Sequence, residues 1–83
     1  MWHVYIIQGK DAKLYTGITT DMQRRLAEHD SGRGGRFTRC RGPFKLRYIE
    51  NSPNRADALS READIKKLER SEKLSLIRSL KNR

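Results

Sequence analysis

The segment Leu14-Tyr-Thr-Gly-Ile-Thr-Thr-Asp-Met-Gln-Arg-Arg-Leu-Ala-Glu-His29 begins like a β-strand and ends like an α-helix. Aromatic and β-branched residues from Leu14 to Ile18 are typical of a strand. Thr19-Thr-Asp21 offers the side chains of a helix N-cap, so Met22 to about Asp30 is expected to form a short amphipathic helix. The segment therefore predicts a strand that leads directly into a helix.

The other elements are predicted from the same kinds of signal. We expect strands at Trp2–Ile7 and Phe44–Ile49, a hairpin loop at Gln8–Lys13, and helices from Ser52-Pro-Asn54 to about Leu68 and from Ser71 onwards. The order β-β-α-β-α-α contains one hairpin and no repeated βαβ unit. This order favours an α+β sandwich, in which helices flank a three-stranded antiparallel sheet. Residues 1–83 are expected to form a single domain.

The chain is strongly basic, with 19 lysine and arginine residues against 10 acidic ones. The formal charge of +9 predicts a polyanionic partner, nucleic acid before an acidic membrane surface; a basic protein without such a partner is the alternative. Cys40 is the only cysteine, which excludes an internal disulfide and argues against structural zinc. No apolar run approaches the roughly 20 residues of a membrane span, and we expect a reduced, cytoplasmic protein that does not bind membranes.

The predicted helix after Asp21 carries two candidate functional side chains. Arg25 and His29 lie one turn apart and border its apolar stripe, whereas Arg24 points away. A guanidinium and an imidazole placed together can bind a phosphate and move a proton near neutral pH. Taken by itself, the helix favours the alternative, a solvated basic helix with a half-buried histidine.

Glu62 is expected within an apolar arc of the next helix. On a helical wheel, the residues of this arc follow one another in the order Leu68, Ile65, Ala58, Glu62, Leu59 and Ala63. A carboxylate among apolar residues is costly unless it is paired or coordinates a metal. In one interpretation Lys66, one helical turn further on, pairs with Glu62 and the pair is structural. In the functional alternative Glu62 faces a cavity and holds Mg²⁺. The wheel leaves both open.

The connector from Ser31 to Ile49 has no acidic residue. Its basic residues are Arg33, Arg36, Arg39, Arg41, Lys45 and Arg47, and its aromatic residues are Phe37, Phe44 and Tyr48. This composition suits phosphate contacts and stacking of unpaired bases. The alternative places Phe44 and Tyr48 in the core, with solvated arginines. We expect phosphate binding here, without stacking by all three aromatics.

Together these positions resemble the GIY-YIG nuclease superfamily, in particular its small stand-alone bacterial proteins, from Trp2 to about Leu80. The motif positions are Val4-Tyr5-Ile6, Tyr15-Thr16-Gly17, Arg25 ten residues after the second tyrosine, His29 one turn later, and Glu62. Departures are His3 in place of the first glycine, Thr16 at the centre of the second half-motif, and Leu74 to Ile77 where some branches use an asparagine.

The resemblance implies a DNA endonuclease with one Mg²⁺ or Mn²⁺ held by Glu62. It implies that Tyr5 and Tyr15 position or deprotonate the attacking water, and which of them is the base stays open. Arg25 then steadies the scissile phosphate and His29 assists proton transfer. A tyrosine acts as a base near neutral pH only where a cation or a proton acceptor assists it.

We expect single-stranded or branched DNA as substrate, in repair or recombination, because 83 residues leave little room for a sequence-reading module. The expected backbone contacts are Arg24, Arg33, Arg36, Arg39, Arg41 and Lys66. No stable protein partner is implied. The alternatives are a nucleic-acid-binding module of the same fold with little or no turnover, and a subunit whose specificity comes from a partner.

Overall fold

The computed structural model describes residues 1–33 and 42–81. Its elements are β1 (Trp2–Gln8), β2 (Leu14–Thr19), α1 (Met22–Asp30), β3 (Lys45–Ser52), α2 (Arg55–Lys66) and α3 (Arg70–Lys81). This order confirms the predicted β-β-α-β-α-α arrangement. No helix in the described ranges has the length and apolar character needed to cross a membrane.

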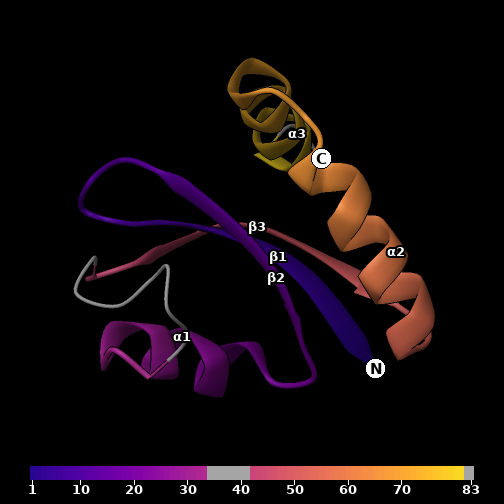
Figure 1. Cartoon of the computed structure of the whole chain (residues 1–83), viewed down its shortest axis with the longest axis horizontal. Helices are drawn as coiled ribbons and strands as arrows, with labels where there is room; N and C mark the ends of the chain where they lie inside the picture. Colours follow the sequence, from indigo (N-terminus) through magenta and orange to yellow (C-terminus); the bar gives the residue numbers. More distant parts are fainter. Residues whose placement is uncertain (34–41, 82–83) are drawn as a thin grey trace.

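The three strands form one antiparallel sheet in the order β2-β1-β3, so that β1 lies in the middle. In Figure 1, α1 covers one face of this sheet, and α2 and α3 lie on the other side. The hairpin register pairs Tyr5 with Gly17 and Ile7 with Tyr15. Since alternate residues of a strand share a face, Tyr5 and Tyr15 both lie on the α1 side.

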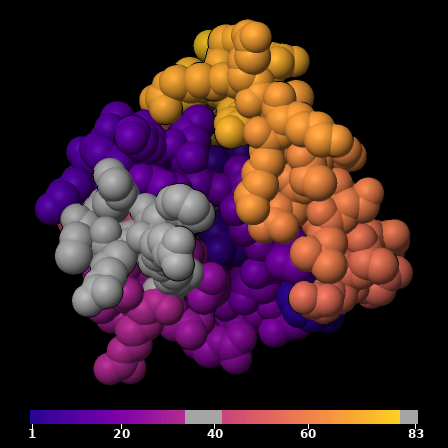
Figure 2. Space-filling view, viewed as in Figure 1, coloured from indigo at the N-terminus to yellow at the C-terminus, as the bar shows by residue number. Residues whose placement is uncertain are grey.

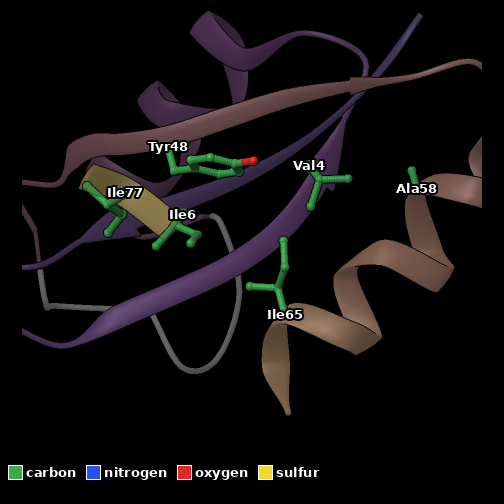
Figure 3. Packing of buried hydrophobic residues seen from close by; sticks show 6 residues of the cluster. All are labelled: Val4, Ile6, Tyr48, Ala58, Ile65 and Ile77. Carbon is green, nitrogen blue, oxygen red and sulfur yellow. The ribbon is translucent and has the colours of Figure 1, made fainter. Parts of the chain in front are cut away.

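Both faces of β1 are buried, because apolar residues alternate between two small cores. The larger core joins β1 and β3 to α2 and α3 and consists of Val4, Ile6, Tyr48, Ala58, Ile65 and Ile77 (Figure 3). The core on the α1 side consists of Tyr5, Ile7 and Phe44, with Tyr15, Met22 and Leu26 packed against it. The candidate tyrosines therefore belong to the same packed layer as α1.

Side-chain caps fix where the first two helices begin. Asp21 accepts a hydrogen bond from the backbone N–H of Arg24, and Asn54 accepts one from that of Asp57. The predicted caps are thus present at both positions.

Several predicted boundaries were wrong by a few residues. β3 runs to Ser52 because its pairing with β1 continues to Trp2, beyond the predicted end at Ile49. α2 ends at Lys66 rather than about Leu68, and a tighter turn follows in which the N–H of Leu68 bonds to the carbonyl of Ile65.

Candidate active site

Tyr5 lies directly over Gly17, its partner on the edge strand β2. A β-carbon on Gly17 would lie 2.4 Å from the Tyr5 Oη and 2.6 Å from Cζ. Glycine is unfavourable inside a strand unless another group must approach the backbone closely. At this position, the absence of a side chain lets the phenol extend across the backbone of β2.

Helix α1 brings Arg25 and His29 to the hydroxyl of Tyr5. The Tyr5 Oη lies 2.8 Å from His29 Nε2, and Arg25 Nε donates to the same oxygen at 3.3 Å. Tyr5 and His29 are buried, and their rings meet edge to face at 5.9 Å. By contrast, the Arg24 side chain is 62% exposed and lies beside Glu28. Of the paired arginines, only Arg25 reaches this centre.

Burial and charge set the protonation of this pair. Burial raises the pKa of Tyr5, against the hydrogen bond and charge of Arg25, which lower it. Burial also lowers the pKa of His29, and the charge of Arg25 lowers it further. Near neutral pH, Tyr5 is therefore a phenol and His29 a neutral imidazole. This state fits a hydrogen bond in which the Tyr5 hydroxyl donates to His29 Nε2.

Tyr15 occupies the same face and makes a different contact. Its hydroxyl donates to the Oδ2 of Asp11 at 2.8 Å. Its ring packs edge to face on Phe44 at 5.7 Å, and Phe44 packs in the same way on His29, also at 5.7 Å. The backbone N–H of Phe44 bonds to Asp30 at the end of α1. The Phe44 ring therefore packs against both Tyr15 and His29.

Sequence patterns do not indicate a role for Asp11, and they mark Phe44 only as a base-stacking or core residue. An aspartate in a hairpin loop is ordinary turn chemistry, and no motif or periodicity marks it. The contact of Asp11 with Tyr15 depends on how the loop folds back on β2, which the sequence pattern does not contain.

Glu62 lies on α2, which packs against β2 and β1. Its side chain is 18% exposed, and its charge contributes to the raised pKa of Tyr5. The carboxylate is thus within electrostatic range of the Tyr5 phenol. The predicted partner is also present, because Lys66 Nζ lies 3.4 Å from Glu62 Oε2.

The expected position of Glu62 within the apolar arc needs correction. Ala58 and Ile65 are fully buried, but Leu59 and Ala63 are exposed. Glu62 therefore borders the buried stripe of α2 instead of lying in its middle. The reason is that α2 contacts the core along one side only, which leaves Leu59 and Ala63 facing solvent. A carboxylate at this border keeps access to water.

The donor chemistry around Glu62 fits a hard divalent cation. Mg²⁺ is commonly bound through one or two carboxylates and completes its coordination with waters and substrate phosphates. Glu62 is one such carboxylate, and its side chain is 18% exposed. In residues 1–33 and 42–81, no group of three or more His, Cys, Asp or Glu side chains is placed to hold a metal ion.

The basic and aromatic residues of the connector are described only in part. Arg33 is exposed, as are Arg24 and Lys66, whereas Arg36, Phe37, Arg39, Cys40 and Arg41 lie outside the described residues. Phe44 and Tyr48 are buried, so the core alternative is right for both, and neither offers a face for base stacking. Figure 2 shows residues of the β1–β2 hairpin reaching the surface between α1 and α2.

The fold and the motif residues define a class of protein. Residues 1–75 match the GIY-YIG catalytic domain, and the chain belongs to this family of nuclease domains. Its similarity to UPF0213 proteins extends over nearly the whole chain. The UPF0213 protein of Halobacterium salinarum is 47% identical over 76 residues, which cover 92% of this chain and 99% of the relative. That of Clostridium perfringens is 49% identical over 79 residues, 95% of this chain and 85% of the relative.

A solved structure supports the same assignment. The solution NMR structure of the UPF0213 protein BH0048 from Bacillus halodurans is 44% identical to this chain. The two structures superpose with a TM-score of 0.61, over 98% of this chain and 86% of the other. The three-stranded sheet with three helices is therefore a fold that this chain shares with that protein.

Proposed function

We propose that this protein is a divalent-metal-dependent endonuclease that hydrolyses DNA phosphodiester bonds in the cytoplasm. Single-stranded or branched DNA is the proposed substrate, and repair or recombination the proposed setting. The observation that carries the proposal is the hydrogen-bonded group of Tyr5, His29 and Arg25 on β1 and α1, with the charge of Glu62 in range. The formal charge of +9 supports a polyanionic substrate.

Tyr5 and His29 form the proposed route for the proton of the attacking water. Water transfers a proton to the Tyr5 oxygen as the Tyr5 hydroxyl proton passes to His29 Nε2, 2.8 Å away. The water oxygen bonds to phosphorus, the bond from phosphorus to the leaving oxygen breaks, and solvent protonates the leaving oxygen. Because burial and Arg25 lower the pKa of His29, the imidazole is neutral and able to accept a proton near pH 7.

Arg25 and Glu62 supply the electrostatic part of the mechanism. The guanidinium has five donors in a fixed fork, so it can contact Tyr5 through Nε and donate to a phosphate oxygen as well, in competition with Glu28, whose Oε1 lies 3.8 Å from Nη1. Glu62 would hold one Mg²⁺ or Mn²⁺. Such an ion, when bound, polarises the phosphoryl oxygen and makes a coordinated water more acidic.

A cleavage assay on labelled single-stranded, duplex and branched DNA and on RNA tests the proposal. We expect cutting of single-stranded or branched DNA with Mg²⁺ or Mn²⁺, and none with EDTA. Glu62→Gln should abolish cleavage while DNA binding persists. Asp64→Asn is the matched control, because it removes the same charge from an exposed position of the same helix. Inactive wild-type protein, or equal cleavage by Glu62→Gln, would contradict the proposal.

The ion pair between Lys66 and Glu62 favours a second candidate function. If Lys66 neutralises the carboxylate permanently, the protein is a nucleic-acid-binding module of the same fold without turnover. This candidate predicts salt-sensitive DNA binding that survives Glu62→Gln and Tyr15→Phe, and no cleavage at any metal concentration. The same assay, with binding measured at two salt concentrations, separates the two functions.

A further inference from the structure

The turn between β1 and β2 has an unusual backbone. Its closing hydrogen bonds join Gly9 N–H to the Lys13 carbonyl at 3.2 Å and Ala12 N–H to the Gly9 carbonyl at 3.0 Å. Ala12 has a φ of 64°, in the left-handed region that residues other than glycine, asparagine and aspartate seldom adopt. Other contacts must therefore maintain this conformation.

Two side chains hold the turn through a single carbonyl. The Ala12 carbonyl accepts a hydrogen bond from Gln8 Nε2 at 3.1 Å and another from Arg70 Nη2 at 2.9 Å. Arg70 is the first residue of α3 and lies 58 positions further along the chain. A tertiary contact from the last helix thus fixes the end of the first hairpin.

The turn places the carboxylate of Asp11 between two donors. Oδ1 accepts from the backbone N–H of Lys13 at 3.1 Å, and Oδ2 accepts from the hydroxyl of Tyr15 at 2.8 Å. The use of both oxygens fixes the plane of the carboxylate. With the Tyr15 ring packed on Phe44, contacts at both ends set the direction of the Tyr15 hydroxyl.

We propose that Asp11 is a positioning residue for phosphodiester hydrolysis: it fixes the direction of the Tyr15 hydroxyl, and Arg70 keeps Asp11 in place. This inference rests on the proposed function. Because the Tyr15 hydroxyl gives its proton to Asp11, its oxygen acts towards a water only as an acceptor. In the proposed reaction the Tyr15 oxygen accepts a hydrogen bond from the attacking water and so directs a water lone pair toward phosphorus.

The two tyrosines have different roles in the proposed reaction. The Tyr5 hydroxyl contacts His29, a neutral group that can take up a proton. The Tyr15 hydroxyl contacts a carboxylate held rigidly by a turn. Tyr5 therefore transfers the proton, and Tyr15 orients the water. A purely structural role for Asp11 would instead affect stability and leave turnover of the folded enzyme unchanged.

Steady-state cleavage of single-stranded DNA with Mg²⁺ by Asp11→Asn, Asp11→Glu and Arg70→Gln tests the proposal. We expect Asp11→Asn to lower kcat at least about tenfold with KM changed less than about twofold. Its Tm should stay within about 2 °C of the wild type, since the altered contacts are exposed. Asp11→Glu keeps the carboxylate and should retain more activity than Asp11→Asn.

Arg70→Gln should lower kcat less than Asp11→Asn, and the double variant should be no slower than Asp11→Asn alone. Such non-additivity is expected when two residues act through the same contact. The matched controls are Asp64→Asn and Lys67→Gln, which remove the same charges from exposed positions outside the site. Both controls should keep wild-type kcat. A kcat of Asp11→Asn equal to that of the wild type overturns the inference.

NMR spectra of the Tyr15 ring give a readout that does not depend on turnover. Asp11→Asn should shift and broaden the Tyr15 ring signals while those of Tyr5 stay unchanged. Unaltered Tyr15 signals overturn the inference even where Asp11→Asn cleaves DNA more slowly than the wild type. A wild-type protein that does not cut DNA overturns the proposed function instead, and the NMR comparison then decides whether Asp11 orients Tyr15.

Discussion

The phenol of Tyr5 lies in the space that a side chain on Gly17 would need, with its hydroxyl oxygen 2.4 Å from the position of a β-carbon. This close approach carries the hydroxyl across β2 to His29 and Arg25. Gly17, the glycine of the second half-motif, therefore leaves the space that Tyr5, the tyrosine of the first half-motif, occupies. Neither residue has its role without the register that pairs them.

Gly17→Ala should displace Tyr5 and impair both stability and activity. Forcing a methyl group into a packed site costs about 1–3 kcal/mol, and we expect cleavage to fall more than about tenfold because the hydroxyl moves away from His29. Urea denaturation and the cleavage assay measure the two effects. The control is Gly32→Ala, which strains a positive φ of 84° in open space. It should lose stability and keep activity; equal activity of the two variants would contradict this account.

Stability should depend on pH through His29. Its folded-state pKa lies below the ordinary value of about 6.5, so the unfolded chain binds the proton more tightly. The stabilisation is fully present above about pH 6.5, and it is lost as pH falls from there through the folded-state pKa. Denaturation between pH 8 and pH 4 should show this loss in the wild type. His29→Gln should reduce the slope below pH 6.5. An unchanged slope in His29→Gln would show that another group is responsible.

Arg25 and Arg24 should differ strongly in their effect on cleavage, although they are adjacent in the sequence. Arg25→Lys loses the fork that contacts Tyr5 and is expected to lower kcat by about 10- to 100-fold. Arg24→Lys keeps the charge at an exposed position and should change kcat less than about twofold. Single-turnover rates at saturating enzyme compare the two. A similar loss of kcat in both variants would mean that the orientation of α1 does not make Arg25 more important for cleavage than Arg24.

Lys66→Gln should lower the Mg²⁺ concentration needed for half-maximal cleavage. The ammonium 3.4 Å from Glu62 competes with a divalent ion for the carboxylate, and its removal favours the metal. Lys67→Gln removes the same charge one residue further on, so both variants should weaken DNA binding by a similar factor. Metal titrations at saturating DNA isolate the difference. The same Mg²⁺ requirement in both variants would show that the ion pair does not oppose metal binding.

The sequence was sufficient for the element order and for the choice between Arg24 and Arg25, because helical periodicity and caps are local. It was less reliable for Glu62. The wheel orders the side chains of α2 correctly but does not say how much of the helix the core covers, and Leu59 and Ala63 proved to be exposed. Whether Tyr5 and Tyr15 share a face depends on the hairpin register, which the sequence pattern does not fix.

By itself, the sequence determined which residue types are present, which elements they form, and that their spacing is that of the GIY-YIG family. Only the tertiary structure placed the Tyr5 hydroxyl against His29 and brought Glu62 within range of it. It alone showed that Arg70 and Asp11 hold the turn beside Tyr15. The reason is physical: propensity and periodicity depend on near neighbours, whereas a hydrogen bond between residues far apart in the chain exists only after packing has fixed both partners.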